Sequence, residues 1–597
     1  MDKPQGTRRR KARRRVMVLL VLCCAVFALF LARLAWLQFA MADHYAQKMA
    51  EAGSASYTLP QHAARGVITD RSGTVLAQDE TVYDVYLRVP APPGTNLRET
   101  VNTIETLTGG KDVETQLAAF CSAVSAGELP VTQGLDSIGA AAYYHAGLVQ
   151  NGAVRLAARG VRRWPDGTIL PHTLGFTGPI TAEQWPAARA QGLAMDATIG
   201  QNGLEAAYDT LLRGRDGQLQ INVGLDGVTR ETVQTSTPVP GCTLVLTLDA
   251  DLQKTLQTAL QNQMDTLRTT KGIGAGREVR AGASVVVDVR TGGILAAASL
   301  PDFDLSRYRS DYAALSADSA APLLDRVCQG LYAPGSAFKP AVAAAALTAG
   351  IDPATTVNCT GKYFYYSNYH PGCLQYGHRG PVDLRTALEY SCNIFFYDTG
   401  RRLGVDTFSA MARQLGLAND TGVEITAAQG RLTWSTDTNY QDGLTLMAAI
   451  GQGNTAVTPL QLAQYAAALA NYGRKPTLHF ADRAVQPATG AAVWQYEPAF
   501  TEIPGGEAVF GPIRDGMKRM AQTARALREA PVTVAAKTGS PQLADTLPGG
   551  SHYVNSVLIG YAPADDPQIA MAVVLEYGGG GANAAPVMRA VLDAWFE

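Results

Sequence analysis

A chain of 597 residues exceeds the usual size of one domain, so two or more domains are expected. Its hydrophobic content of 47% and charged content of 17% exclude a disordered chain and a membrane protein with many spans. A formal net charge of -2 gives no bulk argument for binding nucleic acid.

The N-terminus combines a basic flank with an apolar run. Eight basic residues precede Val16, against the single acid Asp2. Residues 16–38 are almost wholly apolar and are long enough to cross a hydrocarbon core of about 30 Å. The basic flank predicts that residues 1–15 are a cytoplasmic tail and that the rest lies outside the cytoplasm, held in the cell membrane by a single pass.

Two alternatives exist for this segment. Ala40-Met41-Ala42 resembles a signal-peptide cleavage site, but the apolar run is longer than the usual 7–15 residues of such peptides. A buried core helix is disfavoured by the eight basic residues before it. An uncleaved anchor is therefore predicted.

Residues 39–240 are predicted to form a separate domain. Residues 65–77 alternate apolar and polar side chains around a Ser-Gly turn, which indicates a hairpin. Residues 98–160 are rich in Ala, Leu and Glu and are expected to be mainly helical. The prolines of residues 235–241 mark a linker, so the main domain boundary is placed between residues 240 and 241.

Residues 241–597 predict an α+β domain. Strands are expected at both of its ends, within 244–248, 283–299, 532–536, 554–561 and 569–575. Asp249 is placed to cap a helix, and a final helix is expected over residues 585–596. The long middle segment looks helical, which favours one antiparallel sheet with helices packed against it.

Three short motifs follow one another in this second domain. They are Ser336-Ala-Phe-Lys339, Ser391-Cys-Asn393 and Lys537-Thr-Gly539. Each alone is better explained as a solvated pair, a helix cap or a strand-end turn. Their joint occurrence, in this order, points instead to nucleophilic catalysis.

Ser336 and Lys339 share one helix face, because they are three residues apart. A hydroxyl is a poor nucleophile until a base takes its proton, and a lysine can do so only if its pKa falls. Lys537 is expected to supply a second positive charge that favours this fall. Ser336 is therefore predicted to be the nucleophile and Lys339 its base.

The remaining motif residues are assigned to proton transfer and binding. Ser391 is expected to relay a proton toward a leaving amine, and Asn393 to hold Lys339 or a substrate amide. Thr538 and Ser540 are expected to bind a substrate carboxylate.

Glycine and backbone amides complete the predicted site. The N–H groups of Ser336 and of the residue after Gly539 are expected to form an oxyanion hole. A side chain at Gly539 would block the approach of a substrate strand.

The three motifs in this order resemble those of penicillin-binding proteins and serine β-lactamases. Arg65-Gly66 with residues 70–73, and Gly203-Leu-Glu205 with residues 212–214, resemble the pedestal motifs of class B penicillin-binding proteins. Gly451-Gln-Gly453 is similar to a motif of their transpeptidase domains. The chain resembles the elongation-type branch, often called penicillin-binding protein 2, more than the division branch.

The resemblance implies a penicillin-binding, serine β-lactamase-like fold behind a dimerisation-type pedestal. It also implies a peptidoglycan D,D-transpeptidase that acylates its serine with D-Ala-D-Ala stem peptides, cross-links glycan strands and is inhibited covalently by β-lactams. Such enzymes need no cofactor for catalysis and work beside a SEDS-type membrane glycan polymerase, and no nucleic acid is expected as a partner. A division or sporulation role is the alternative to elongation.

Cys359, Cys373, His378 and Cys392 fall within a short stretch that includes the second motif. Three thiols and one imidazole are a donor set suited to tetrahedral zinc. A Cys359–Cys373 disulfide and free thiols are the alternatives, and His370 is a possible substitute ligand.

Other functions fit the sequence less well. A β-lactamase needs a deacylating base, and no convincing E-x-x-x-N segment follows the second motif; the pedestal would also be superfluous. A β-lactam sensor usually has several spans and a cytoplasmic effector, whereas one span is predicted here. A scaffold would not need the complete set of motifs.

Overall fold

The computed structural model describes residues 6–42, 44, 55–124, 127–195, 197–223, 229–373, 378–548 and 550–597. The chain divides into two compact units, Met1–Ala63 with Arg215–Val239, and Ala64–Gly214 with Pro240–Glu597. The domain bounds predicted from the sequence stay predictions.

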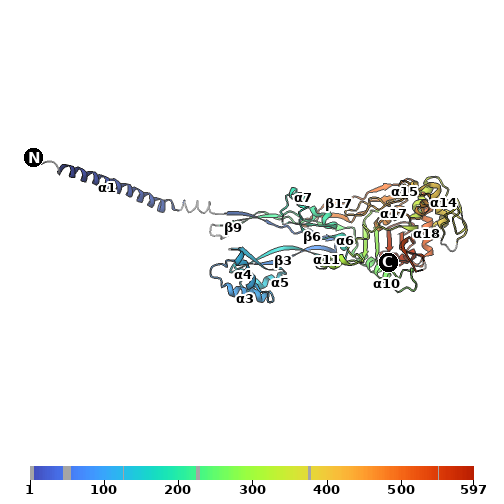
Figure 1. Cartoon of the computed structure of the whole chain (residues 1–597), viewed down its shortest axis with the longest axis horizontal. Coiled ribbons are helices and arrows are strands. Elements are labelled where there is room, and N and C mark those ends of the chain that lie inside the picture. Colours follow the sequence, from blue (N-terminus) through green and yellow to red (C-terminus); the bar gives the residue numbers. More distant parts are fainter. Residues whose placement is uncertain are drawn as a thin grey trace. The chain divides into compact units, whose positions relative to one another are not determined.

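The first unit contains the apolar N-terminal helix α1 (Gly6–Ala35), followed by one π-helical turn (Trp36–Ala40) (Figure 1). Within the candidate span Arg13–Ala40, an 18-residue window has a mean hydropathy of 2.7, and the apolar side chains from Val16 onward are exposed, which is what a lipid-facing helix requires. The same unit holds an antiparallel sheet of order β1-β8-β9, formed by β1 (Ala55–Gln61), β8 (Gly217–Val223) and β9 (Thr229–Ser236).

The second unit is built on a five-stranded antiparallel sheet of order β12-β11-β23-β22-β19. Its strands are β11 (Gly282–Asp288), β12 (Ile294–Leu300), β19 (Ala535–Gly539), β22 (Ser556–Ala562) and β23 (Ile569–Leu575). Successive side chains of β11 enter two different cores: Val285 and Val287 face one, and Val286 faces the other. The sheet is therefore buried on both faces, which explains its continuous apolar runs.

Helices cover both faces of this sheet. α10 (Ala250–Arg268) and α20 (Ala585–Phe596) pack together on the face that contains Val286. On the other face, α17 (Pro459–Ala470) packs directly against the strands, begun by a capping box between Thr458 and Gln461. The other helices of this part are α12 (Lys339–Thr348), α13 (Leu384–Glu389), α14 (Asn393–Leu403), α15 (Val405–Gln414), α16 (Asp442–Ala449), α18 (Gly506–Thr523) and α19 (Arg525–Arg528). The predicted α+β class is confirmed.

A second, seven-stranded sheet combines strands from distant parts of the chain. Its path is β17-β16-β10-β2-β3-β4, with β5 also paired to β3. The strands are β2 (Ile68–Thr69), β3 (Val75–Val89), β4 (Gly127–Leu135), β5 (Val154–Arg163), β10 (Thr243–Leu246), β16 (Ala481–Val485) and β17 (Ala492–Gln495). The predicted hairpin at the Ser-Gly turn is β2–β3, where Gly73 has a φ of 97°.

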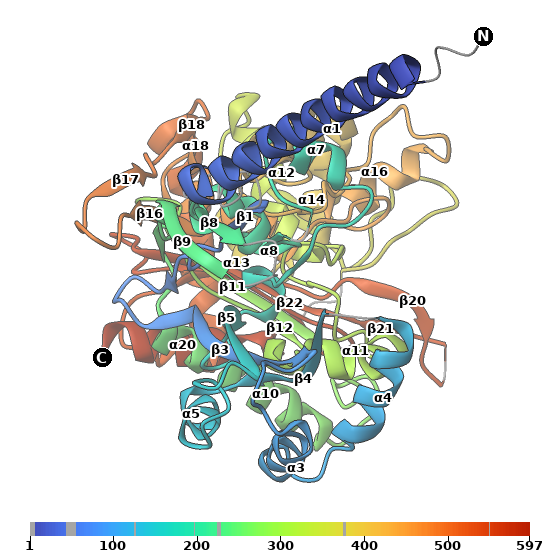
Figure 2. The ribbon, with the colours of Figure 1, turned by 90° about the vertical axis from the view of Figure 1, so that its left-hand side faces the viewer.

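Residues 98–160 are not mainly helical, contrary to expectation. They contain α3 (Leu97–Leu107), α4 (Val113–Ala123) and α5 (Ser137–His145), but β4 and most of β5 also lie here (Figure 2). Both strands pair with β3, and this long-range pairing outweighs local propensity. β4 tolerates Pro130 because it lies at the edge of the sheet.

Short elements complete the second unit. They are α6 (Pro171–Leu174), β6 (Thr177–Pro179), α7 (Trp185–Ala190), β7 (Thr198–Gly200), α8 (Gly203–Ala207), α9 (Asp209–Leu212), α11 (Tyr308–Ala317), β13 (Val357–Cys359), β14 (Gly380–Val382), β15 (Arg474–Pro476), β18 (Phe500–Glu502), β20 (Gln542–Thr546) and β21 (His552–Val554), with 3₁₀ turns at Leu305–Arg307, Gly335–Phe338 and Gly581–Ala584.

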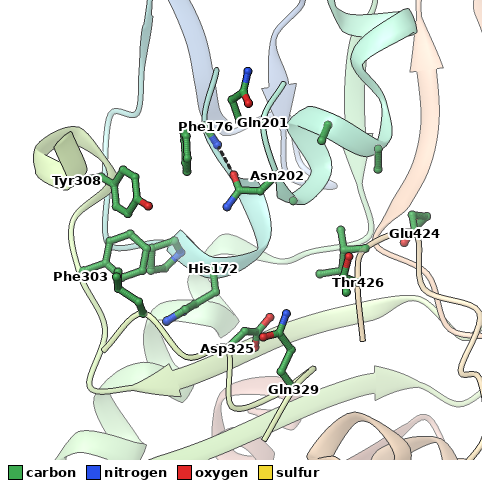
Figure 3. Close-up of a pocket in the computed structure, with 16 residues that line it drawn as sticks. His172, Phe176, Gln201, Asn202, Phe303, Tyr308, Asp325, Gln329, Glu424 and Thr426 are labelled. Atoms are coloured by element: carbon green, nitrogen blue, oxygen red, sulfur yellow. Dashed lines mark hydrogen bonds between the residues drawn. The ribbon is translucent and has the colours of Figure 1, made fainter. Parts of the chain in front are cut away.

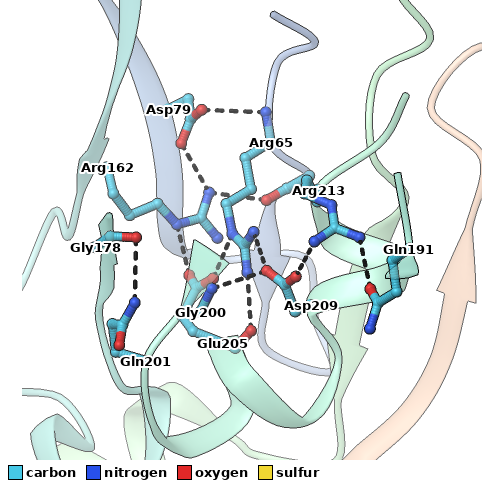
Figure 4. A network of polar contacts seen from close by, with 11 residues as sticks. Arg65, Asp79, Arg162, Gly178, Gln191, Gly200, Gln201, Glu205, Asp209 and Arg213 are labelled. Atoms are coloured by element: carbon cyan, nitrogen blue, oxygen red, sulfur yellow. Dashed lines mark hydrogen bonds and ion pairs between the residues drawn. The ribbon is translucent and has the colours of Figure 1, made fainter. Parts of the chain in front are cut away.

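A buried ionic cluster lies where α8 and α9 meet β3 and β5 (Figure 4). The Glu205 carboxylate, which is fully buried, accepts a hydrogen bond of 2.6 Å from Arg65 Nε and another of 2.6 Å from Arg162 Nε. Arg65 also pairs with Asp209, at 2.7 Å. The pedestal motifs singled out in the sequence therefore serve to join their strands and helices into one packed body.

Candidate active site

Ser336 lies in the 3₁₀ turn Gly335–Phe338, which runs directly into α12. Gly335 has a φ of 55°, a conformation that favours glycine, and its N–H donates to Gly451 O at 2.9 Å. This turn places Ser336, half-buried, at the N-terminal end of the helix. Unpaired backbone N–H groups at such an end favour negative charge.

Lys339 is fully buried behind this turn. Its Nζ lies 2.7 Å from Ser391 O, 2.7 Å from Asn393 Oδ1 and 3.1 Å from Ser391 Oγ. Burial lowers the pKa of Lys339 to about 7, and the nearby thiols of Cys392 and Cys373 only partly oppose this fall. A large share of Lys339 is therefore a neutral amine near neutral pH.

Ser391 connects the two lysines of the motifs. Its Oγ lies 3.0 Å from Lys537 Nζ as well as 3.1 Å from Lys339 Nζ. Burial, and then the charge of Lys339, lower the pKa of Lys537. Ser391 has a φ of 56°, which is unfavourable for a residue other than glycine, and this conformation accompanies contact of both its carbonyl and its hydroxyl with Lys339.

The third motif ends strand β19, which forms the edge of the five-stranded sheet. A Cβ at Gly539 would lie 2.2 Å from Pro334 O, so only glycine lets this strand approach the Ser336 turn. Ser540 Oγ accepts a hydrogen bond of 2.9 Å from Gly581 N, which fixes the hydroxyl beside the motif.

One cavity of about 560 Å³ brings most of the predicted residues together. This volume is typical of a small-molecule site. Lys339 and Lys537 reach it through the hydroxyl of Ser391. The lining residues are Ser336, Tyr369, Pro371, Gly372, Ser391, Asn393, Tyr397, Met447, Ile450, Gln452, Thr538, Ser540, Gln542 and Val554.

Sequence reasoning did not assign several of these lining residues. Tyr397 follows Asn393 by four positions on α14, so helical periodicity could have placed it on the same face. Gln452 belongs to the Gly-Gln-Gly motif, and a Cβ at Gly451 would lie 2.2 Å from Gly335 O, so this motif supports the Ser336 turn. No local signal points to Tyr369.

The predicted metal-binding residues also converge. The ligand atoms of Cys359, Cys373, His378 and Cys392 lie within 4.8 Å of one another, and all four residues are buried. Cys359 and Cys392 carry free thiols. His370 takes no part in this group and instead contacts Phe364, at 5.0 Å between ring centroids.

A second cavity, of about 490 Å³, lies apart from the three motifs (Figure 3). His172, Asp325 and Glu424 line it, which superficially suggests acid–base chemistry. However, the Asp325 carboxylate accepts from the N–H groups of Val327 and Cys328, and Glu424 from those of Phe480 and Ala481. These carboxylates hold loops together, and none of the three motifs contributes a residue to this second cavity.

The fold and the Ser336 cavity define a serine acyl-transfer enzyme of the transpeptidase type. Residues 282–593 match the family model of the penicillin-binding protein transpeptidase domain, and residues 60–246 match the penicillin-binding protein dimerisation domain. The chain belongs to the penicillin-binding protein transpeptidase family, in its class B, penicillin-binding protein 2-like branch.

Similar proteins of known name support this family assignment. The chain is 29% identical to peptidoglycan D,D-transpeptidase MrdA of Acinetobacter baumannii, over 96% of this chain and 86% of that protein. It is 26% identical to MrdA of Escherichia coli K12, over 90% of this chain and 87% of the relative.

Among solved structures, a chain of a peptidoglycan synthase complex that coordinates polymerization and crosslinking is 28% identical, with a TM-score of 0.74 and 98% of both chains covered. Penicillin-binding protein 2 of Helicobacter pylori, solved in complex with MreC, has a TM-score of 0.73 at 23% identity, over 91% of this chain and 99% of that one, and supports the fold.

Proposed function

We propose that this enzyme is an elongation-type peptidoglycan D,D-transpeptidase that forms an acyl-enzyme at Ser336. Its substrate is a stem peptide ending in D-Ala-D-Ala, and its product is a cross-link between two glycan strands. The observation that carries the proposal is the convergence of Ser336, Ser391 and Asn393 with the Lys537-Thr-Gly539 strand on one cavity, backed by a buried Lys339 of lowered pKa.

In the first half-reaction Ser336 Oγ attacks the carbonyl carbon of the penultimate D-Ala, and neutral Lys339 takes the hydroxyl proton. The N–H groups of Ser336 and Ser540 stabilise the developing oxyanion. The C–N bond then breaks, and a proton delivered through Ser391 Oγ, which contacts both lysines, goes to the leaving amine of the terminal D-Ala. Thr538 and Ser540 hold the carboxylate of that terminal residue.

In the second half-reaction an amine of a neighbouring stem peptide attacks the ester carbonyl. The amine loses a proton to the basic residues, the C–O bond to Ser336 breaks, and Ser336 Oγ takes a proton back. Asn393 Oδ1 lies 2.7 Å from Lys339 Nζ and keeps the Lys339 amine in place through both half-reactions.

The N-terminal helix suits an enzyme that works on the cell surface. The candidate span Arg13–Ala40 follows a basic tail, which supports a cytoplasmic N-terminus and a catalytic unit outside the membrane. The similarity to a chain of a peptidoglycan synthase complex supports a glycan polymerase as the partner. The resemblance to the elongation-type branch implies that this polymerase is a membrane protein of the SEDS type.

The proposal is tested by incubating the chain without its apolar N-terminal helix with a reporter penicillin. The intact mass of the protein is then followed over time. A persistent single adduct is expected, and Ser336→Ala should abolish it because the attacking oxygen is gone. Ser551→Ala, at an exposed serine, is the matched control and should react normally. Rapid loss of the adduct with consumption of the drug would indicate a β-lactamase, and no adduct at all would refute the proposal.

We also propose a structural zinc ion held by Cys359, Cys373, Cys392 and His378. Tetrahedral zinc takes bonds of about 2.0–2.3 Å to such ligands, and their donor atoms already lie within 4.8 Å of one another. His378 Nε2 lies 3.6 Å from Cys373 Sγ, so the imidazole already faces a thiol of this group. A bound zinc ion supplies positive charge that stabilises buried thiolates, and Cys392 would thereby fix the turn that carries Ser391 and Asn393.

Purified protein is therefore expected to contain close to one zinc ion per chain by elemental analysis. Cys359→Ser should lower this ratio markedly and reduce thermal stability, because a ligand that fixes the loop is lost. His370→Ala is the matched control and should retain the metal. A ratio near zero in the unmodified protein would rule out the zinc site.

A further inference from the structure

The segment between Cys359 and Cys373 is unusually aromatic. Residues 360–372 contain four tyrosines and one phenylalanine, together with Lys362 and His370, and no carboxylate. We call this segment the aromatic loop. Nothing in the mechanism above uses its outward-facing rings.

The aromatic loop is held firmly at its base. Cys373 N donates to Gly361 O at 2.9 Å, and Tyr363 N donates to Pro371 O at 3.0 Å, so the two ends of the loop form a narrow neck. Tyr363 is buried, and its hydroxyl lies 3.0 Å from Asp398 Oδ1 and 2.9 Å from Arg401 Nε. These contacts fix the loop on helix α14, which also begins with Asn393.

Three rings of the aromatic loop remain open to solvent. Phe364 is 64% exposed, Tyr365 58% and Tyr369 37%. Tyr365 stacks on Tyr363 at 6.3 Å between centroids, and the Arg401 guanidinium lies 4.0 Å from the centre of the Tyr365 ring. Exposed aromatic rings held in fixed orientations are typical of a binding surface rather than of a random surface loop.

One end of the aromatic loop lines the Ser336 cavity. Tyr369, Pro371 and Gly372 line the cavity together with Ser336, and Asn393 Nδ2 donates to Gly372 O at 3.3 Å. A ligand that extends from the cavity along the loop therefore meets Tyr369 first. The loop thus lies along one route by which the part of a substrate beyond the reacting peptide can leave the cavity.

We propose that Phe364, Tyr365 and Tyr369 form a stacking surface for a sugar ring of the glycan strand that carries the stem peptide. This inference rests on the proposed function and names a second contact of the same substrate. A pyranose ring presents a flat face of C–H groups that packs on an aromatic ring, while its hydroxyls remain free for polar groups at the edge. Lys362, Arg401 and the tyrosine hydroxyls supply such groups here, and a neutral sugar requires no countercharge from the loop.

The test compares a substrate with and without its glycan. The double variant Phe364→Ala/Tyr365→Ala and the unmodified protein are given un-crosslinked glycan strands bearing stem peptides, a short peptide ending in D-Ala-D-Ala, and a reporter penicillin. The variant is expected to raise KM for the glycan-linked substrate by about ten-fold without a matching fall in kcat. The KM for the short peptide should stay within about two-fold. Tyr312→Ala, at an exposed tyrosine of α11, is the matched control, and Phe364→Tyr/Tyr365→Phe should restore binding.

Equal KM values of the variant and the unmodified protein for the glycan-linked substrate would overturn the stacking surface. Equal losses with the short peptide would also overturn it, since the loop would then merely shape the catalytic cavity. A change confined to assembly with another protein would identify the surface as a protein interface and overturn the proposal as well. Failure of the proposed function is distinct, because the unmodified protein would then form no penicillin adduct.

Discussion

Replacing Lys339 with methionine is expected to slow acylation of Ser336 by a reporter penicillin by about 10³-fold, within the range that loss of a general base produces. Lys339 is the proposed base because its buried amine has a lowered pKa and lies three residues after Ser336, and methionine has no basic nitrogen. Lys339→Arg should be similarly impaired, because a guanidinium does not lose its proton in proteins. The measurement is the second-order acylation rate followed by intact mass.

The pH profile of the unmodified enzyme tests the same assignment. Burial lowers the Lys339 pKa to about 7, so the amine is neutral above this pH and protonated below it. The acylation rate should therefore rise with pH and level off above about 7. A rate that stays constant down to pH 5 would contradict the role of Lys339 as base.

A matched control is available in Lys475. This lysine is also largely buried, and burial lowers its pKa, but it lies on β15 and does not line the Ser336 cavity. Lys475→Met should leave the acylation rate unchanged, although it should change the free energy of unfolding by an amount similar to that of Lys339→Met. Equal losses in both variants would mean that the effect of Lys339 is structural.

Replacing Glu205 with alanine is expected to lower the free energy of unfolding of the second unit by about 3–5 kcal/mol. The carboxylate is fully buried between Arg65 and Arg162 (Figure 4), so its removal leaves two buried guanidinium groups without their shared partner. Denaturant unfolding followed by tryptophan fluorescence measures this change. Protein that remains folded should still form the penicillin adduct, since Glu205 does not line the catalytic cavity.

Glu80→Ala is the control for this prediction. Glu80 pairs with Arg163 at 3.2 Å, but both side chains are more than half exposed, and such pairs contribute less than about 1 kcal/mol. A loss of similar size in both variants would show that burial of the Glu205 carboxylate is unimportant.

The family, the α+β class and the transpeptidase activity could be predicted because their signals are local. A serine and a lysine three residues apart, or a glycine after Lys-Thr, are visible in the sequence wherever the chain later folds. The helix Ala585–Phe596 was predicted at its observed bounds for the same reason: its apolar periodicity is complete within its own sequence. The roles assigned to the motif residues stay predictions that the Ser336 and Lys339 variants test.

Features that depend on distant pairing could not be predicted in the same way. Local composition favoured helix over residues 98–160, but the partner strand β3 determines the conformation of β4 and β5. The contribution of Tyr369 to the cavity depends on the fold of the aromatic loop, and no periodicity encodes it. The grouping of the four possible zinc ligands cannot be seen in the sequence, because only the fold brings these separate residues together.

The seven-stranded sheet has a consequence for how the enzyme is made. The parallel neighbours β2 and β10 belong to the same sheet as the outer strands β16 and β17. In the chain, however, the long segment that contains Ser336 and Ser391 separates β10 from β16. During synthesis at about 5–20 residues per second, β2 to β5 leave the ribosome tens of seconds before β16 can join them. The nascent chain must therefore keep an unpaired strand edge from aggregating over that interval. The yield of folded enzyme therefore depends on whether the sheet is completed before its open edge pairs with another chain.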